Sequence, residues 1–260
     1  MSERIKPRFS RYIGIGYSGA KTPDSSLKRL RVYEADREYM VVEVKPPPSP
    51  SKYWTRRGLA QWLVEQLSRN VPTIVGIGHG FSFPLRYFEA HHLEPNWPIF
   101  LDDFQKHWPT DAEHTYVDFI RGEGEVRSGS ARWRRITEER AGAKSVFHFD
   151  VPGSVAKSTH AGLPWLRYLR NQLGERLHFW PFDGWEIFAG KSALVEVYPS
   201  LWSKSTPRAG RIPGQHDAYV TAAWLRQVDM DGSLRKFLKP DMLPGEDPVA
   251  QVEGWILGVM

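Results

Sequence analysis

The sequence contains no cysteine, and this absence removes several classes of site at once. Disulfides, zinc ribbons, iron–sulfur clusters and thiol catalysis all require that residue. No apolar run approaches the roughly 20 residues that a membrane-spanning helix needs. The first residues, MSERIKPRFSR, also lack the apolar centre of a signal peptide. We therefore expect a cytoplasmic protein with no membrane partner.

The composition is that of an ordinary globular chain. Of the 260 residues, 41% are hydrophobic and 25% are charged, which is enough for one well-cored domain with a large insertion. The formal net charge of +5 is compatible with a polyanionic partner without requiring one. We expect a single domain over residues 1–260.

A short motif occurs twice. Residues 12–20 read YIGIGYSGA and residues 74–84 read IVGIGHGFSFP, so two apolar runs end in Gly-Ile-Gly and a polar turn. The first copy has the G-x-G-x-x-G spacing of a dinucleotide-binding loop, but KTPDSS at 21–26 does not open the helix that such a loop needs. Residues 153–159, GSVAKST, lack the glycines of a P-loop before Lys157. Neither segment is interpreted as a nucleotide loop.

The hydrophobic pattern predicts an α/β protein with a mixed sheet. Strands are predicted at 11–17, 27–36, 38–47, 73–78, 145–150, 177–185 and 192–199. Helices are predicted at 56–70 after an N-cap at Thr55, from about 158 to 174, at 216–229, and within 247–258. The strand at 73–78 is expected beside the strand at 11–17.

Residues 85–150 interrupt this rhythm with aromatic residues and prolines. We interpret them as a partly helical insertion with a mobile Gly/Ser-rich arm at 122–131.

Two acids stand out. Asp217 begins the helix at 216–229, next to His216, in a segment with a small-residue face of Ala218, Thr221 and Ala222. Glu196 lies in the strand VEVYP, on the face opposite to its valine neighbours. An acid in an apolar strand is costly unless it is paired, solvated or metal-bound. A solvated Glu196 and a helix-start role for Asp217 remain open alternatives.

The insertion carries a basic segment. Seven Lys or Arg residues lie between Arg121 and Lys144 against four Glu, and Trp133 stands among Arg132, Arg134 and Arg135. Arginine beside an aromatic ring can hold phosphate and stack a base. These four residues and Lys21 are predicted to bind nucleic acid, with a solvated loop as the alternative.

Four stretches together resemble the RNase H fold, and more narrowly the uncharacterised family of predicted RNase H-like nucleases called domain of unknown function 429. They are GIGYSGA (14–20), VGIGHGFSFP (75–84), VEVYPSLW (195–202) and HDAYVTAAW (216–224). The resemblance implies an RNase H-like mixed sheet flanked by helices. It also implies a cluster of carboxylates that holds one or two Mg²⁺ or Mn²⁺ ions for phosphodiester hydrolysis.

This sequence departs from that pattern at two positions. Gly16 and Gly78 stand where the family has aspartate, so Asp217 is the one acid that remains, with Glu196 and His216 as helpers. In an active protein the resemblance makes Asp217 and Glu196 metal ligands and His216 a proton shuttle. Without the two aspartates, two-metal cleavage is expected to fail or to be severely weakened, and then no cofactor is expected.

The leading hypothesis is therefore an RNase H-like protein of metal-dependent nuclease ancestry with impaired catalysis. Two alternatives stay open. One is a non-catalytic nucleic-acid-binding module, and the other is a nucleotide- or anion-binding enzyme that acts on a small molecule.

Overall fold

A computed structural model of the chain describes residues 6–38, 40–124 and 126–260. The strands are β1 (Arg11–Gly16), β2 (Arg31–Asp36), β3 (Val42–Val44), β4 (Thr73–Ile77), β5 (Leu177–Phe179), β6 (Ser192–Val197) and β7 (Ile256–Leu257). Position 39 of the predicted strand at 38–47 and position 125 of the predicted arm lie outside the described residues.

The helices are α1 (Arg56–Leu67), α2 (Leu85–Ala90), α3 (Trp97–His107), α4 (Val117–Gly122), α5 (Ile136–Arg140), α6 (Ala156–Leu173), α7 (Pro213–Met230), α8 (Leu234–Phe237) and α9 (Glu246–Glu253). Short 3-10 turns are η1 (Gly174–Arg176), η2 (Pro199–Leu201) and η3 (Ser203–Ser205). The predicted cap of α1 is confirmed, because the Thr55 hydroxyl accepts a hydrogen bond from the Gly58 N–H at 2.9 Å.

The strands form one mixed sheet in the order β3-β2-β1-β4-β6-β5, with β7 also paired to β6. The β1–β2 and β2–β3 pairs are antiparallel, whereas β1–β4, β4–β6 and the remaining pairs are parallel. The predicted pairing of the first and fourth strands is confirmed. So is the fold class, an RNase H-like mixed sheet flanked by helices with a partly helical insertion.

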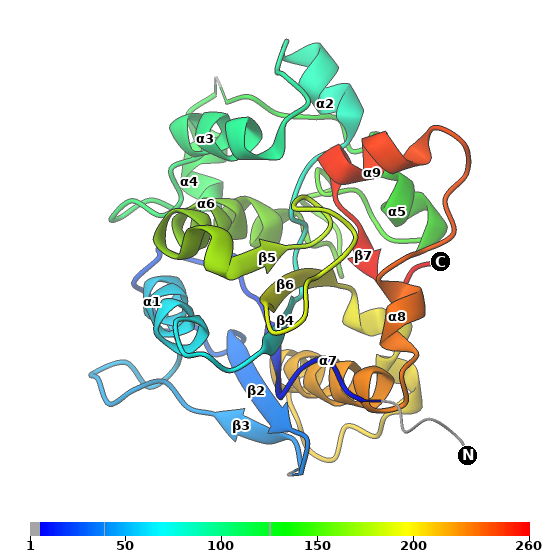
Figure 1. Cartoon of the computed structure of the whole chain (residues 1–260). Coiled ribbons are helices and arrows are strands. Elements are labelled where there is room, and N and C mark those ends of the chain that lie inside the picture. The colour runs from blue at the N-terminus through cyan, green and yellow to red at the C-terminus, as the bar shows by residue number, and fades with distance from the viewer. Residues whose placement is uncertain (1–5, 39, 125) are drawn as a thin grey trace.

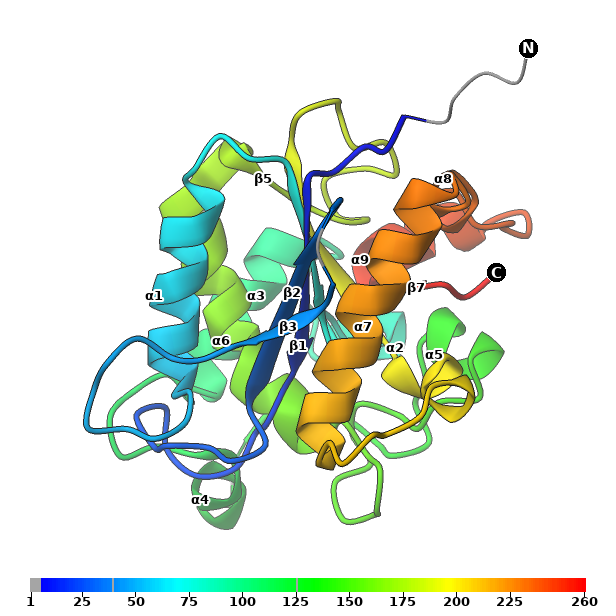
Figure 2. The same cartoon turned by 90° about the horizontal axis from the view of Figure 1, so that it is seen from below.

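Helices cover both faces of the sheet (Figures 1 and 2). Helices α1 and α6 lie on one face and α7 on the other, as the view along the sheet shows. Alternation along β1 follows this layering: Ile13 and Ile15 belong to the core on the α1/α6 side, and Tyr12 belongs to the core on the α7 side. The insertion between β4 and α6 contributes α2 to α5.

Helix α7 packs against β1 with almost no side chains between them. A Cβ atom placed on Gly14 would lie 2.1 Å from the carbonyl oxygen of Ala218, and one on Gly16 would lie 2.3 Å from that of Gly214. The predicted small-residue face of α7 is therefore the face that contacts the sheet. This contact fixes the start of α7 beside the carboxyl end of β1.

Two predictions about local structure are wrong. Residues 145–150 form turns instead of a strand: Val146 and Phe147 are buried, yet the segment bonds to itself, for example from the His148 N–H to the Ser145 carbonyl. An apolar hexapeptide can be buried without joining a sheet, and its pattern alone does not separate the two cases. The C-terminal segment 247–258 is also divided, because α9 ends at Glu253 and β7 follows.

Across the described ranges, the helices are too short or too polar to cross a membrane.

Candidate functional site

The carboxyl ends of the parallel strands β1, β4 and β6 meet at one edge of the sheet, where a pocket of about 280 Å³ opens. We call it the strand-end pocket. Gly16 ends β1, Gly78 follows β4, and Asp217 comes from the second turn of α7; all three line it. The structure thus brings together the two positions that lack the expected acid and the one acid that remains.

Asp217 is the carboxylate of this pocket. Within the described part of the chain, its side chain makes no hydrogen bond or ion pair that would neutralise it, and it is partly buried. Burial raises the pKa of Asp217 above its usual value, although nearby His216 and Arg208 oppose the shift. The pocket therefore contains an acid that takes up a proton more readily than an exposed aspartate does.

Donor groups line the rest of the strand-end pocket. Arg29, exposed in the loop before β2, is its cation, and the hydroxyl residues Ser154, Ser158, Tyr198 and Ser200 add polar atoms. The pocket also meets the first turns of α6 and α7, where main-chain N–H groups lack helical acceptors. Sequence reasoning missed Arg29, because nothing in the run LKRLR at 27–31 separates it from Lys28 and Arg31.

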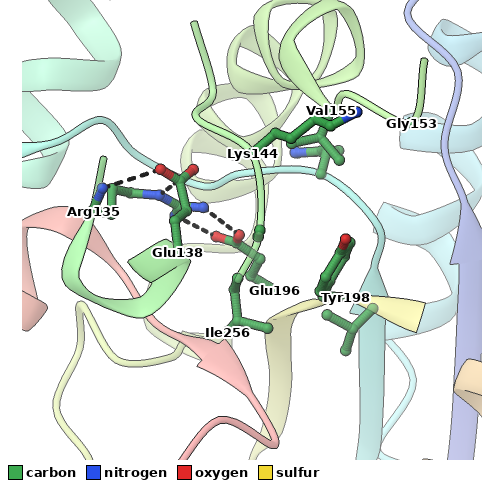
Figure 3. Close-up of a pocket in the computed structure, with 11 residues that line it drawn as sticks. Arg135, Glu138, Lys144, Gly153, Val155, Glu196, Tyr198 and Ile256 are labelled. Atoms are coloured by element: carbon green, nitrogen blue, oxygen red, sulfur yellow. Dashed lines mark hydrogen bonds and ion pairs between the residues drawn. The ribbon is translucent and has the colours of Figure 1, made fainter. Parts of the chain in front are cut away.

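Glu196 lies elsewhere, in a buried ion pair with Arg135 (Figure 3). Its Oε1 accepts from Arg135 Nη2 at 2.6 Å, and its Oε2 accepts from Arg135 Nη1 at 2.7 Å and from the Phe81 N–H at 2.9 Å. Both residues are almost inaccessible, with side-chain exposures of 1% for Arg135 and 4% for Glu196. Both oxygens of Glu196 are thus engaged by protein donors.

A second carboxylate completes this cluster. Glu138 is fully buried and accepts from Arg135 Nε at 3.1 Å, and Figure 3 shows the guanidinium between the two acids. Burial on its own lowers the pKa of Arg135, but Glu196 and Glu138 outweigh it and raise that pKa above its usual value. Arg135 is therefore a permanent internal cation, which corrects the expectation that it contacts phosphates from an exposed arm. The sequence could not show this, because Arg135 follows three residues that are wholly or partly exposed.

The other predicted residues are spread over the molecule. His216 is 2% exposed and its Nε2 donates to the Ser203 carbonyl at 3.2 Å, so the ring is turned towards η3. Lys21, Arg132 and Arg134 are exposed, and none of them lines the strand-end pocket. Trp133 is partly buried and lies 5.5 Å from the guanidinium of Arg86.

The donor set does not fit a divalent metal. Magnesium and manganese sites take several oxygen ligands, usually with more than one carboxylate. The strand-end pocket has one carboxylate, that of Asp217, and both oxygens of Glu196 are already bonded to Arg135. The described residues also contain no cluster of three His, Cys, Asp or Glu side chains that could hold a metal. We therefore derive no chemical step through a metal.

The strand-end pocket can bind an anion at the carboxyl ends of the strands. It offers Arg29, hydroxyl residues and first-turn N–H groups beside Gly78, where the missing side chain leaves room for a ligand. Searches of protein-family models, curated proteins and solved structures found no match to this chain.

Proposed function

We propose that the chain is an RNase H-like protein of nuclease ancestry, related to the family that its sequence resembles, whose strand-end pocket binds a phosphate of a nucleic acid. The observation that carries the proposal is the convergence of Gly16, Gly78 and Asp217 on one pocket. Metal-dependent cleavage is expected to be weak or absent, because a single carboxylate cannot complete a metal site there.

Arg29 supplies the positive charge for this binding. It is the Lys or Arg residue among those that line the strand-end pocket, its side chain is exposed, and guanidinium groups bind phosphate through paired hydrogen bonds. Gly78 carries no side chain, and a Cβ there would meet nothing closer than 3.5 Å, so a phosphate oxygen can approach its main chain closely. Asp217 repels the phosphodiester anion while it is ionised, which makes phosphate binding sensitive to its protonation.

Fluorescence anisotropy with labelled single-stranded DNA, duplex DNA and RNA tests the proposal. Arg29→Ala should weaken binding by about tenfold and make its salt dependence shallower, since one phosphate contact is lost. Lys28→Ala is the matched control, because Lys28 is an adjacent exposed cation that does not line the pocket. Equal losses in both variants, or no binding by the wild type, would contradict the proposal.

The ancestry is tested by restoring an acid. A Cβ on Gly78 meets nothing closer than 3.5 Å, so Gly78→Asp is sterically acceptable, whereas Gly16→Asp would push against the backbone of Gly214. We expect Gly78→Asp to gain Mn²⁺ binding, measured by calorimetry, and Mn²⁺-dependent cleavage of a labelled oligonucleotide. Gly122→Asp, at an open position outside the pocket, is the control. No gain in the first variant would argue against the ancestral metal site.

A second candidate is a nucleotide- or anion-binding enzyme that acts on a small molecule. It is favoured by one observation: the strand-end pocket is close to the size of small-ligand sites, and the exposed arginines of the insertion do not line it. A thermal-shift screen with inorganic phosphate, mononucleotides and oligonucleotides separates the two. Stabilisation by mononucleotides with no response to oligonucleotides would favour this candidate over the first.

A further inference from the structure

The chain leaves the strand-end pocket after η2 and returns to it at the start of α7. Ser200 lines the pocket, residues 201–212 do not, and Pro213, Gly214 and Asp217 line it again. Figure 2 shows these residues passing from the yellow turns of η2 and η3 to the start of α7. We call residues 201–212 the return segment. Because both of its ends lie at the rim of the pocket, the segment borders the pocket.

The return segment is basic. It contains Lys204, Arg208 and Arg211 and no Asp or Glu. Lys204 and Arg208 are exposed, and among the described residues no acid forms an ion pair with either of them. Exposed cations that no acid neutralises attract an anionic partner. A polyanion bound in the pocket would therefore gain further cations by extending over the return segment.

Arg211 anchors the tip of the return segment to α7. Its guanidinium carbon lies 3.7 Å from the centre of the Tyr219 ring, which belongs to α7. Its main-chain N–H donates to the Arg208 carbonyl at 2.9 Å, so the tip is a tight turn. This turn holds Arg208 close to the helix that carries Asp217.

The charge of Arg208 reaches the strand-end pocket. Burial raises the pKa of Asp217, and the charges of His216 and Arg208 oppose that rise, so the guanidinium acts on this carboxylate from outside the pocket lining. The segment that carries Arg29 also reaches the start of α7, because a Cβ on Gly214 would lie 2.2 Å from the Arg29 carbonyl oxygen. Arg29 and Arg208 thus come from two segments that meet at the start of α7.

We propose that the return segment binds the phosphate next to the one in the strand-end pocket, with Arg208 as its contact and Lys204 as an additional cation. One nucleic-acid strand then crosses the rim of the pocket. The inference rests on the proposed function, because it needs such a strand in the pocket. It adds that the protein recognises at least two adjacent phosphates, which a nucleoside monophosphate cannot supply.

Salt-dependent anisotropy with labelled oligothymidylate tests the second contact. Arg208→Ala should weaken binding about 3- to 10-fold and make the slope of log affinity against log salt shallower by about 0.7, the value for one phosphate of a single strand. Arg208→Lys keeps the charge and should retain most of the affinity. Arg235→Ala is the matched control, because Arg235 is exposed in α8, which follows the far end of α7. Unchanged affinity and slope in Arg208→Ala would overturn the inference.

A double variant separates this contact from the one at Arg29. If the two arginines hold different phosphates, the losses in Arg29→Ala and Arg208→Ala should add, and the slope should change by about 1.4. A double variant that binds no more weakly than Arg29→Ala would place both arginines on one phosphate. That result would overturn the inference and leave the proposed function intact. A loss in Arg208→Ala with none in Arg29→Ala would contradict the proposed function and the inference together.

Competition tests the chemical class of the partner. At constant ionic strength, unlabelled oligothymidylate should displace the labelled strand far more effectively than polyglutamate of equal charge, because guanidinium groups at fixed positions match the spacing of phosphates along the strand. Equal displacement by the two polymers would mean that the return segment binds acidic chains in general. It would overturn nucleic acid as the specific partner of this segment.

Discussion

The two Gly-Ile-Gly segments are alike in sequence, but α7 packs against them at different distances. On β1, a Cβ on Gly14 or Gly16 would meet main-chain oxygens of α7 at 2.1 and 2.3 Å, and a backbone cannot move aside cheaply. On β4, a Cβ on Gly76 would meet the Thr221 side chain at 2.6 Å, and one on Gly78 would meet nothing closer than 3.5 Å. Glycine is therefore required by packing on β1, whereas at Gly78 packing leaves room for a side chain.

The loops that follow the two motifs are also held in different ways. After β1, Arg56 donates to three carbonyl oxygens and has no ion-pair partner among the described side chains. After β4, Glu196 accepts from the Phe81 N–H and is itself paired with Arg135. Burial lowers the pKa of Arg56, whereas Glu196 and Glu138 raise that of Arg135 despite its burial. A similar turn can thus be held by a cation alone or by an ion cluster.

The largest expected effect comes from removing the cation of that cluster. Arg135→Met leaves Glu138 and Glu196 buried without a counter-charge and should lower the free energy of unfolding by about 3–5 kcal/mol. Urea unfolding measures it, with Arg134→Met as the control, since Arg134 is exposed and its loss should cost less than about 0.5 kcal/mol. Similar values for the two variants would mean that the cluster does not hold the β4 loop.

The packing difference is tested by two alanine variants. Gly16→Ala should lower the free energy of unfolding by about 3 kcal/mol, because the new methyl group forces α7 away from β1. Gly78→Ala should change it by less than about 1 kcal/mol, and the reduced freedom of the unfolded chain favours a slight gain. Thermal and urea unfolding of both variants measure these changes. A larger loss of stability in Gly78→Ala than in Gly16→Ala would contradict the packing difference.

The two motifs should also affect stability at low pH differently, because the first Gly-Ile-Gly is followed by Tyr17 and the second by His79. Burial lowers the pKa of His79 to about 4, so the folded state binds fewer protons there than the unfolded state. Above the usual histidine pKa, His79 is neutral in both states and costs no stability. As the pH falls from about 6.5 to 4, the unfolded state takes up the proton first, and the free energy of unfolding decreases by about 3 kcal/mol in total.

Replacing the histidine should reduce that loss. His79→Gln should lose less stability than the wild type between pH 7 and pH 4.5, as measured by urea unfolding at each pH. A parallel loss in both proteins would show that other groups dominate this range. The buried His160, whose pKa burial lowers to about 3, provides a second site for the same comparison.

The smallest effect concerns ligand binding between the two motifs. The pKa of Asp217 is raised by burial, so its carboxylate becomes protonated at a higher pH than an exposed aspartate. Affinity for a phosphodiester should therefore increase as the pH falls through the raised pKa of Asp217, by about 3- to 10-fold. Asp217→Asn should bind as the protonated protein does and lose this dependence, as anisotropy at each pH would show. An unchanged slope would contradict the role given to Asp217.

Much of the fold could be predicted from the sequence, because local pattern determines it. The strands at β1, β4 and β6 and the helices α1, α6 and α7 follow from apolar periodicity and caps. The turns at 145–150 could not be separated from a strand, since both bury Val146 and Phe147. At the candidate site, Gly16, Gly78 and Asp217 were predicted together and do converge, whereas Arg29 carried no local signal.

The sequence alone determined which residue types the two strand ends carry, and hence that one acid remains where a metal site needs several. Only the tertiary structure decided which charges face one another. It places Glu196 against Arg135, 61 positions away along the chain, and it leaves Arg56 with carbonyl partners. The reason is physical: local pattern reports burial and period, whereas the pairing of buried charges depends on contacts between distant segments.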